Sequence, residues 1–266
     1  MGQSQIFSKF PSLKIAQVAC EAYFEWIDVL EAVDEAKDQF LLVEIGAALG
    51  YRGRDAATAA KARGIPYHLV FIEGEPARAE ESIHLEMQKN NIPESQYTIF
   101  PYCVGSTEQD VMFYISHQGQ NLDVRNWFGQ RAVFQEDKMI QWLPTVYMGR
   151  QVGRTMQGYD AVMVRQKKLS DLLNLVRQPI IDICDFDIQG SEAEVIDESL
   201  AILNNRVKRL HIGTHSHKIE ATLRSLLKKN GWRLIRDYPC AQENDTEYGR
   251  AKFEDGIQTW LNSRLM

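Results

Sequence analysis

The chain has 266 residues and a net charge of −6, and 44% of its residues are hydrophobic while 25% are charged. This composition is typical of a soluble globular protein with one large α/β domain or two small ones. The negative charge gives no general attraction to nucleic acid or anionic lipid, and the sequence has no run of eighteen apolar residues. We therefore expect neither nucleic acid nor a membrane as a partner.

The N-terminus and the cysteines indicate a cellular compartment. The first residues, MGQSQIFSKF, lack the apolar stretch of a secretory signal. The four cysteines lie far apart, without a CxxC pair, at positions 20, 103, 184 and 240. This spacing favours reduced thiols over a disulfide framework or a zinc site. We therefore expect a cytoplasmic protein.

Apolar runs of strand length alternate with helical patterns along most of the chain. The first pattern is a long amphipathic helix over residues 12–39. The expected strands are FLLVEI (40–45), YHLVFIE (67–73), TIFPYCVG (98–105), IIDICDFDI (180–188) and VKRLHIGTH (207–215). Helices are expected after the first strand, over 77–90, and at SEAEVIDESLAIL and IEATLRSLLKKNG. This alternation predicts a doubly wound, mostly parallel sheet.

The end and the middle of the chain depart from this alternation. WRLIRDYP (232–239) and GIQTWLN (256–262) are joined by a polar loop, which predicts a terminal antiparallel pair of strands. Residues 110–165 have weaker periodicity, and such an insertion is usually a lid or a substrate-binding wall. We therefore divide the chain into an N-terminal helical segment (1–39) and a main domain (40–266) that carries this insertion.

The stretch LVEIGAALG places Glu44, Gly46 and Gly50 where the first strand ends. Ligands of open α/β sheets bind at such carboxyl ends, although a glycine there can also serve a turn alone. A dinucleotide site requires G-x-G-x-x-G around a pyrophosphate, whereas here two alanines replace the middle glycine and Glu44 would repel phosphates. Glu73, which ends the second strand, can accept hydrogen bonds from a ribose diol. The pattern favours a cationic nucleoside without phosphates, such as S-adenosylmethionine (SAM).

These stretches resemble the FkbM-type family of SAM-dependent methyltransferases over roughly residues 40–262. LLVEIGAALG resembles the first SAM motif of the family, VFIEGEP its ribose-binding strand end, and PYCVG the segment after its third strand. DFDIQGSEAEVI resembles the most recognisable block of the family, and LHIGTHS, NGW and DGIQTWLN resemble its C-terminal third. Two positions differ from many members, which carry lysine in place of Asp185 and glutamate in place of Gln189.

The resemblance implies a Rossmann-like methyltransferase fold, in which a seven-stranded sheet has an antiparallel last strand. It implies SAM as the cofactor and O-methylation of a small hydroxylated molecule or sugar, which is the expected partner; the sequence leaves a homo-oligomer open. The candidate SAM-binding residues lie in the family's cofactor motifs and at the ends of the third and fourth strands. They are Glu44, Gly46, Ala47, Gly50, Glu73, Gly74, Cys103, Val104 and Asp185.

Methyl transfer from a sulfonium to an alcohol requires aligned reacting atoms and a base that takes the alcohol's proton. His215, where the fifth strand ends, is the first candidate for this base because the ordinary pKa of histidine is close to neutral, and a structural role is the alternative. Asp185 and Asp187 share one face of a regular strand, and one of them could receive the SAM amine or an acceptor hydroxyl. Together they could hold Mg²⁺ if Glu192 reached the same ion.

Three further residues are candidates for substrate contact. Gln189 can orient a substrate by donating and accepting hydrogen bonds, and Trp127 could line an acceptor pocket if it is not a core residue. His217 is the third candidate, with a surface position at a helix start as its alternative. The functions that stay open are an N-methyltransferase, an NAD-linked oxidoreductase or epimerase, and a non-catalytic SAM-binding scaffold. We expect the N-terminal helix to cover the cofactor as a lid.

Overall fold

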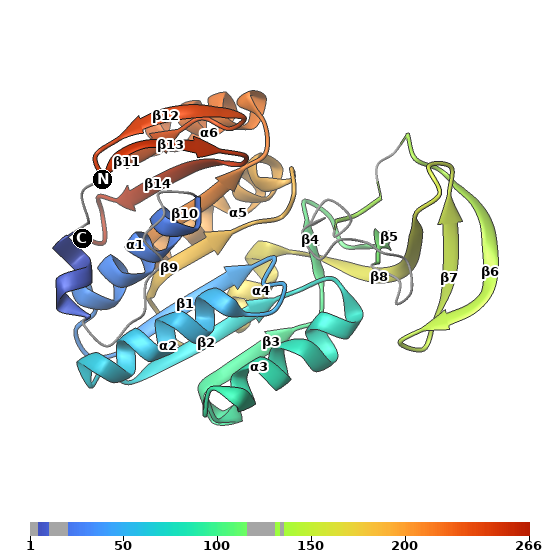
Figure 1. The fold of residues 1–266 in the computed structure, drawn as a ribbon, viewed down its shortest axis with the longest axis horizontal. Helices are drawn as coiled ribbons and strands as arrows, with labels where there is room; N and C mark the ends of the chain where they lie inside the picture. Colours follow the sequence, from blue (N-terminus) through green and yellow to red (C-terminus); the bar gives the residue numbers. More distant parts are fainter. Residues whose placement is uncertain (1–4, 11–20, 116–130, 134–135) are drawn as a thin grey trace.

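The structure is a computed structural model, and it describes residues 5–10, 21–115, 131–133 and 136–266. Its main layer is a seven-stranded sheet (Figure 1). In spatial order the strands are β11 (Trp232–Tyr238), β14 (Gly256–Asn262), β10 (Val207–Thr214), β9 (Ile181–Phe186), β1 (Phe40–Ile45), β2 (Tyr67–Ile72) and β3 (Tyr97–Phe100). The pairs from β10 to β3 are parallel, while β14 is antiparallel to both of its neighbours. The predicted doubly wound sheet with an antiparallel last strand is confirmed.

Helices cover both faces of this sheet (Figure 1). One face carries α1 (Glu21–Glu35), α2 (Tyr51–Arg63) and α3 (Ile83–Lys89), and the other carries α4 (Leu169–Leu175), α5 (Glu192–Arg206) and α6 (His217–Lys229). Short helical segments are η1 (Gln5–Lys9), η2 (Arg78–Ser82) and η3 (Glu94–Gln96). Along β1, Phe40 and Leu42 pack toward α1 and α2 while Leu41 and Val43 pack toward α4 and α5, as expected for a strand buried on both faces. None of the described helices is both long and apolar enough to cross a bilayer.

A second sheet lies to one side of the main sheet, at the right of Figure 1. Its strands are β4 (Cys103–Gly105), β8 (Asp160–Lys168), β7 (Arg150–Thr155) and β6 (Met139–Tyr147) in this order, and β5 (Gln109–Tyr114) also pairs with β8. The prediction of one strand over 98–105 is wrong, because Pro101 separates β3 from β4 and the two strands belong to different sheets. The predicted polar loop before β14 instead contains a hairpin of β12 (Gln242–Thr246) and β13 (Gly249–Phe253).

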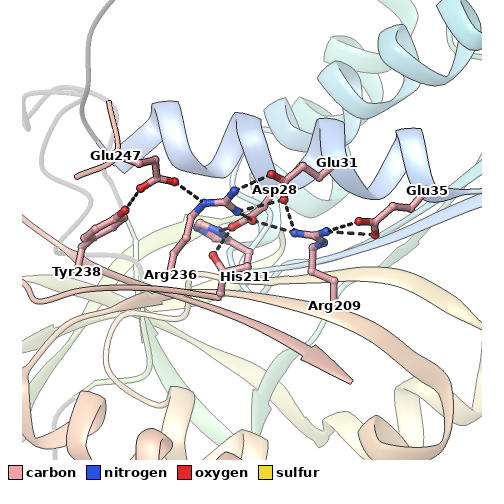
Figure 2. Close-up of polar contacts among 9 residues, drawn as sticks. Asp28, Glu31, Glu35, Arg209, His211, Arg236, Tyr238 and Glu247 are labelled. Carbon is pink, nitrogen blue, oxygen red and sulfur yellow. Dashed lines mark hydrogen bonds and ion pairs between the residues drawn. The ribbon is translucent and has the colours of Figure 1, made fainter. Parts of the chain in front are cut away.

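A buried network of charges fixes α1 to the main sheet (Figure 2). Asp28 has no exposed surface and accepts hydrogen bonds from His211 Nδ1 at 2.6 Å, Arg236 Nη1 at 2.5 Å and Thr259 Oγ1 at 2.5 Å. Arg209 Nη1 donates to the same carboxylate at 3.2 Å. Burial alone would raise the pKa of Asp28, but the hydrogen bond from His211 and the charges of Arg236 and Arg209 lower it to about 2.

Two further carboxylates of α1 extend this network (Figure 2). Glu31 accepts from Arg209 Nη1 and Arg236 Nη2, each at 2.6 Å, and Glu35 accepts twice from Arg209 Nη2, at 3.0 and 3.1 Å. The apolar side of the same helix is also buried, with Phe24 fully enclosed. The described part of this helix is therefore packed as a core helix, and its role as a lid stays a prediction.

We expect Asp28→Asn to lower the free energy of unfolding by about 3–5 kcal/mol, because it leaves Arg209 and Arg236 without their buried counter-charge. Asp34→Asn is the matched control: it makes the same change on the same helix, where the carboxylate pairs with exposed cations, and should cost less than about 1 kcal/mol. Urea unfolding of both variants measures the difference. Equal losses of unfolding free energy in the two variants would show that the buried network stabilises the fold no more than an exposed ion pair does.

Candidate active site

Two cavities at the carboxyl ends of the parallel strands share Gly46, Ala48, Asp187 and Gln189. The first has a volume of about 430 Å³ and lies between the ends of β1 and β2 and the second sheet. The second has a volume of about 280 Å³ and lies between the ends of β1 and β9, the start of α1 and the β13–β14 turn. Because both cavities border the turn between β1 and α2, this turn is the centre of one candidate site.

The turn after β1 approaches β9 too closely for a side chain at Gly46. Gly46 has φ +82°, and a Cβ atom there would lie 1.9 Å from the backbone oxygen of Asp187. The amides of Gly46 and Ala47 donate to the carbonyl of Ile72 at 2.9 and 3.2 Å, and the amide of Asp187 donates to the carbonyl of Ile45 at 2.9 Å. The predicted glycine turn therefore joins the ends of β1, β2 and β9.

Two buried carboxylates hold this turn by accepting backbone amides. Glu44 Oε2 accepts from the amide of Gly53, in the first turn of α2, at 2.8 Å. Glu73 Oε2 accepts from the amide of Ala48 at 2.6 Å, and its Oε1 accepts from the amide of Glu75 at 2.7 Å. Burial raises the pKa of both carboxyls, that of Glu73 to about 7. Each oxygen of Glu73 keeps a second lone pair, so this wall of the first cavity can also accept hydrogen bonds from a ligand.

Three other predicted cofactor residues, Gly74, Cys103 and Val104, also line the first cavity. A Cβ atom on Gly74 would lie 2.9 Å from the ring of Phe113, so the missing side chain lets the second sheet pack against the end of β2. Gly50 lines neither cavity. It has φ +74° at the N-cap of α2, which is a structural role, and its contact with a cofactor stays a prediction.

Asp185 is a buried carboxylate on the wall of the second cavity, and it has no hydrogen bond from any described residue. Its side chain lies on the face of the sheet that carries α1, beside His211 of β10 in register. Burial raises the pKa of Asp185, although the charges of His211 and Arg52 oppose this shift. A buried carboxylate without donors is suited to a ligand that brings a positive charge and N–H groups.

His215 lies among three carboxylates. Its Nδ1 is 2.8 Å from Glu192 Oε1, and its Nε2 is 3.3 Å from Asp187 Oδ1 and 3.8 Å from Asp255 Oδ1. Burial alone would lower the pKa of His215, but the contacts with Asp187 and Glu192 raise it to about 10. The ring is therefore protonated at neutral pH. In this arrangement it lies at ion-pair distance from Asp187, and its role as the base stays a prediction.

Glu192 is not grouped with Asp185 and Asp187 as a set of metal donors among the described residues. It is fully buried, and its Oε1 accepts the backbone amides of Ile188 at 3.2 Å and Gly190 at 3.0 Å besides contacting His215. Among the described residues, the three His, Cys, Asp or Glu donors close enough to share an ion lie elsewhere in the fold. The Mg²⁺ expectation therefore has no support from these residues.

Asp187 and Gln189 lie where the two cavities meet. The side chain of Asp187 is 53% exposed and accepts from Gln189 Nε2 at 2.7 Å. Desolvation at the cavity wall opposes ionisation of Asp187, but the nearby His215 ring and the hydrogen bond from Gln189 lower its pKa. His217 lines neither cavity: it begins α6 with 65% of its side chain exposed, as the surface alternative predicted. Trp127 lies outside the described residues.

The sequence analysis missed parts of both cavity walls. The additional polar residues of the second cavity come from α1, α2 and the β13–β14 turn: Glu21, Glu25, Arg52, Glu254 and Asp255. Those of the first cavity come from the second sheet and the segments that flank it, and they include Tyr102, Gln109, Arg131 and Gln166. Arg52 stands beside LLVEIGAALG and Asp255 is the first residue of DGIQTWLN, whereas the α1 residues carry no local signal.

No model of a known protein family matches the sequence. A protein of Jannaschia sp. (strain CCS1), described as "Putative methyltransferase", is 28% identical over 220 residues, which are 83% of this chain and 72% of that protein. The FkbM methyltransferase of Methylobacillus flagellatus KT has a TM-score of 0.49 at 10% identity, over 96% of this chain and 58% of that one. Precorrin-6y C5,15-methyltransferase of Geobacter metallireducens GS-15 has a TM-score of 0.47 at 9% identity, over 98% and 92% of the chains.

We expect Gly46→Ala to lower the free energy of unfolding by about 2–5 kcal/mol, because the new Cβ atom adds a clash with the end of β9 to an unfavourable positive φ. Gly149→Ala is the matched control: Gly149 has φ +74°, but no heavy atom lies within 4 Å of the added Cβ. It should cost only about 1–2 kcal/mol. Chemical unfolding measures both losses, and equal values would show that the close approach at Gly46 has no energetic weight.

Proposed function

We propose that the chain is a SAM-dependent methyltransferase that methylates a hydroxyl group of a small molecule. The observation that carries the proposal is the pair of cavities on either side of the turn after β1, with Glu73 on one wall and the unpaired Asp185 on the other. The similarity to the Jannaschia protein supports methyl transfer. When bound, SAM supplies an electrophilic methyl group on a positively charged sulfur.

The residues of the two cavities suit the two ends of SAM. In the first cavity, Glu73 can accept hydrogen bonds from ribose hydroxyls, and the buried Cys103 and Val104 offer apolar atoms to an adenine face. In the second cavity, Asp185 can accept from the ammonium group of the methionine end. Arg52, which pairs with Glu25 on the same wall, can contact the carboxylate. The ribose, adenine, ammonium and carboxylate groups of SAM therefore each have a suitable residue in one of the two cavities.

Asp187 is our candidate for the residue that accepts a hydrogen bond from the acceptor's hydroxyl and so orients it. Its exposed carboxylate stands where the two cavities meet, and Gln189 beside it can orient the hydroxyl. The His215 ring lies 3.3 Å from Asp187 Oδ1, and in this proposal it is a positioning residue that holds the Asp187 carboxylate in place. Because His215 also contacts Glu192, it fixes the distance between Asp187 and the first turn of α5.

The acidity of the second cavity favours one alternative, a nitrogen acceptor. Seven carboxylates line this cavity: Glu21, Glu25, Glu44, Asp185, Asp187, Glu254 and Asp255. Arg52 is the single guanidinium or ammonium group among its described lining residues. Such an excess of negative charge attracts a cationic amine. Methyl-transfer assays with matched alcohols and amines separate the two acceptors.

S-Adenosylhomocysteine, the product that remains after methyl transfer, is the first ligand to titrate by calorimetry, with NAD as the negative control. We expect it to bind the wild type and to bind Glu73→Gln at least about tenfold more weakly, a loss of about 1.4 kcal/mol, because the amide removes one acceptor oxygen. Glu243→Gln on the exposed face of β12 is the matched control and should bind normally. Folded wild-type protein that fails to bind this product would refute the proposal.

The affinity for S-adenosylhomocysteine should rise between about pH 6 and pH 8. The pKa of Glu73 is about 7 in the free protein, and donation by ribose hydroxyls stabilises the charged carboxylate, so binding lowers this pKa. Binding near pH 7 must then release protons, which calorimetry in two buffers of different ionisation enthalpy counts. Glu73→Gln should lose this release. Proton uptake by the wild type would assign the ribose contact to another group.

A further inference from the structure

We propose that His217, Glu220 and Cys240 bind one zinc ion beside the start of α6, outside both cavities. An imidazole nitrogen, a carboxylate oxygen and a thiol sulfur lie within 4.8 Å of one another there. His217 and Glu220 are three residues apart on α6, so one side of the helix presents both, and Cys240 follows β11. Zinc accepts nitrogen, oxygen and sulfur donors in one site.

The distances between the donor atoms match the edges of a zinc tetrahedron. His217 Nδ1 lies 3.1 Å from Glu220 Oε2 and 3.8 Å from Cys240 Sγ. Bond lengths of about 2.0 Å to nitrogen or oxygen and about 2.3 Å to sulfur give edges of about 3.3 and 3.5 Å at tetrahedral angles. The two distances from His217 Nδ1 therefore lie within a few tenths of an ångström of these edges, and the third, between the Glu220 oxygen and the Cys240 sulfur, is at most 4.8 Å.

The same contacts exclude a cysteine nucleophile activated by a histidine relay. In such a relay the thiol and the carboxylate contact opposite ring nitrogens, because the ring transfers a proton between them. Here Glu220 and Cys240 both approach Nδ1 of His217. Three donors that converge on one point are the arrangement of a metal site.

The scaffold holds the donors in place and balances their charge. Glu220 is buried, and its Oε1 accepts from the amide of Cys240 at 2.7 Å and from Thr214 Oγ1 at 3.4 Å. Arg224 lies 3.5 Å from Glu220 Oε2, but its shorter contacts, at 2.6 and 2.8 Å, are with Asp237. A thiolate and a carboxylate then neutralise the two charges of the ion. Buried ions are stable when they are neutralised in this way.

Three protein donors leave one coordination position of a tetrahedral ion for water or another ligand. His217 is the exposed member of the set, so this open position faces solvent. The sequence alone pointed away from zinc, because no CxxC pair is present and Cys240 is twenty positions beyond Glu220. The antiparallel end of the main sheet brings them together.

Untagged protein, freed of metal with a chelator, is titrated first with Co²⁺ and then with Zn²⁺. We expect one Co²⁺ per chain with a thiolate-to-cobalt charge-transfer band, and displacement of the Co²⁺ by Zn²⁺. Cys240→Ser should remove the band, and His217→Ala should weaken zinc binding at least about 100-fold, beyond the loss typical of an outer-shell change. The matched controls Cys103→Ser and His84→Ala should keep both signals, because neither residue belongs to the cluster.

Thermal unfolding of the metal-free variants checks that the fold is intact, and the exposed position of His217 makes its replacement the safer test. The proposal is overturned if the wild type gives no charge-transfer band, if the band survives in Cys240→Ser, or if His217→Ala binds zinc as tightly as the wild type. Loss of binding in His84→Ala would place the metal elsewhere and would also overturn it.

Discussion

The candidate site depends on two buried carboxylates that fix the turn after β1. Glu44 connects the end of β1 to the first turn of α2 through the amide of Gly53, and Glu73 connects the end of β2 to the turn through the amide of Ala48. Removing either acceptor would leave a buried amide unpaired, which costs more than the net gain of one hydrogen bond. The backbone that borders both cavities is therefore held in place before any ligand arrives.

The same arrangement gathers negative charge at one edge of the sheet. Glu44, Asp185, Asp187 and Glu192 all stand at strand ends or helix starts there, and mutual repulsion contributes to the raised pKa of Glu44 and Asp185, although burial is the larger cause. The protonated His215 offsets part of this charge, and so does the amino-terminal dipole of α2 and α5. Asp185 has no such partner among the described residues. A cationic ligand would complete the balance.

The sequence predicted the strand ends and the residues at them, because both follow from short-range patterns. A parallel sheet brings the carboxyl ends of its strands to one edge, so apolar runs that end at Glu44, Glu73 and Asp185 sufficed to place these residues around one site. The raised pKa of His215 depends on Asp187 and Glu192, which only the tertiary fold brings to its ring. The second sheet was missed because β6 is mostly exposed and irregular in register, which removes the alternation of a half-buried strand.

The second sheet contacts the cofactor side of the site through a short chain of hydrogen bonds. Tyr147 of β6 donates its hydroxyl to Glu75 Oε1 at 2.7 Å, and the amide of Glu75 donates to Glu73 Oε1 at 2.7 Å. Glu75 is almost fully buried, so loss of the hydrogen bond from Tyr147 would leave a buried carboxylate oxygen without this donor, which costs free energy. The second sheet therefore encloses the first cavity and is also connected to Glu73 through Tyr147 and Glu75.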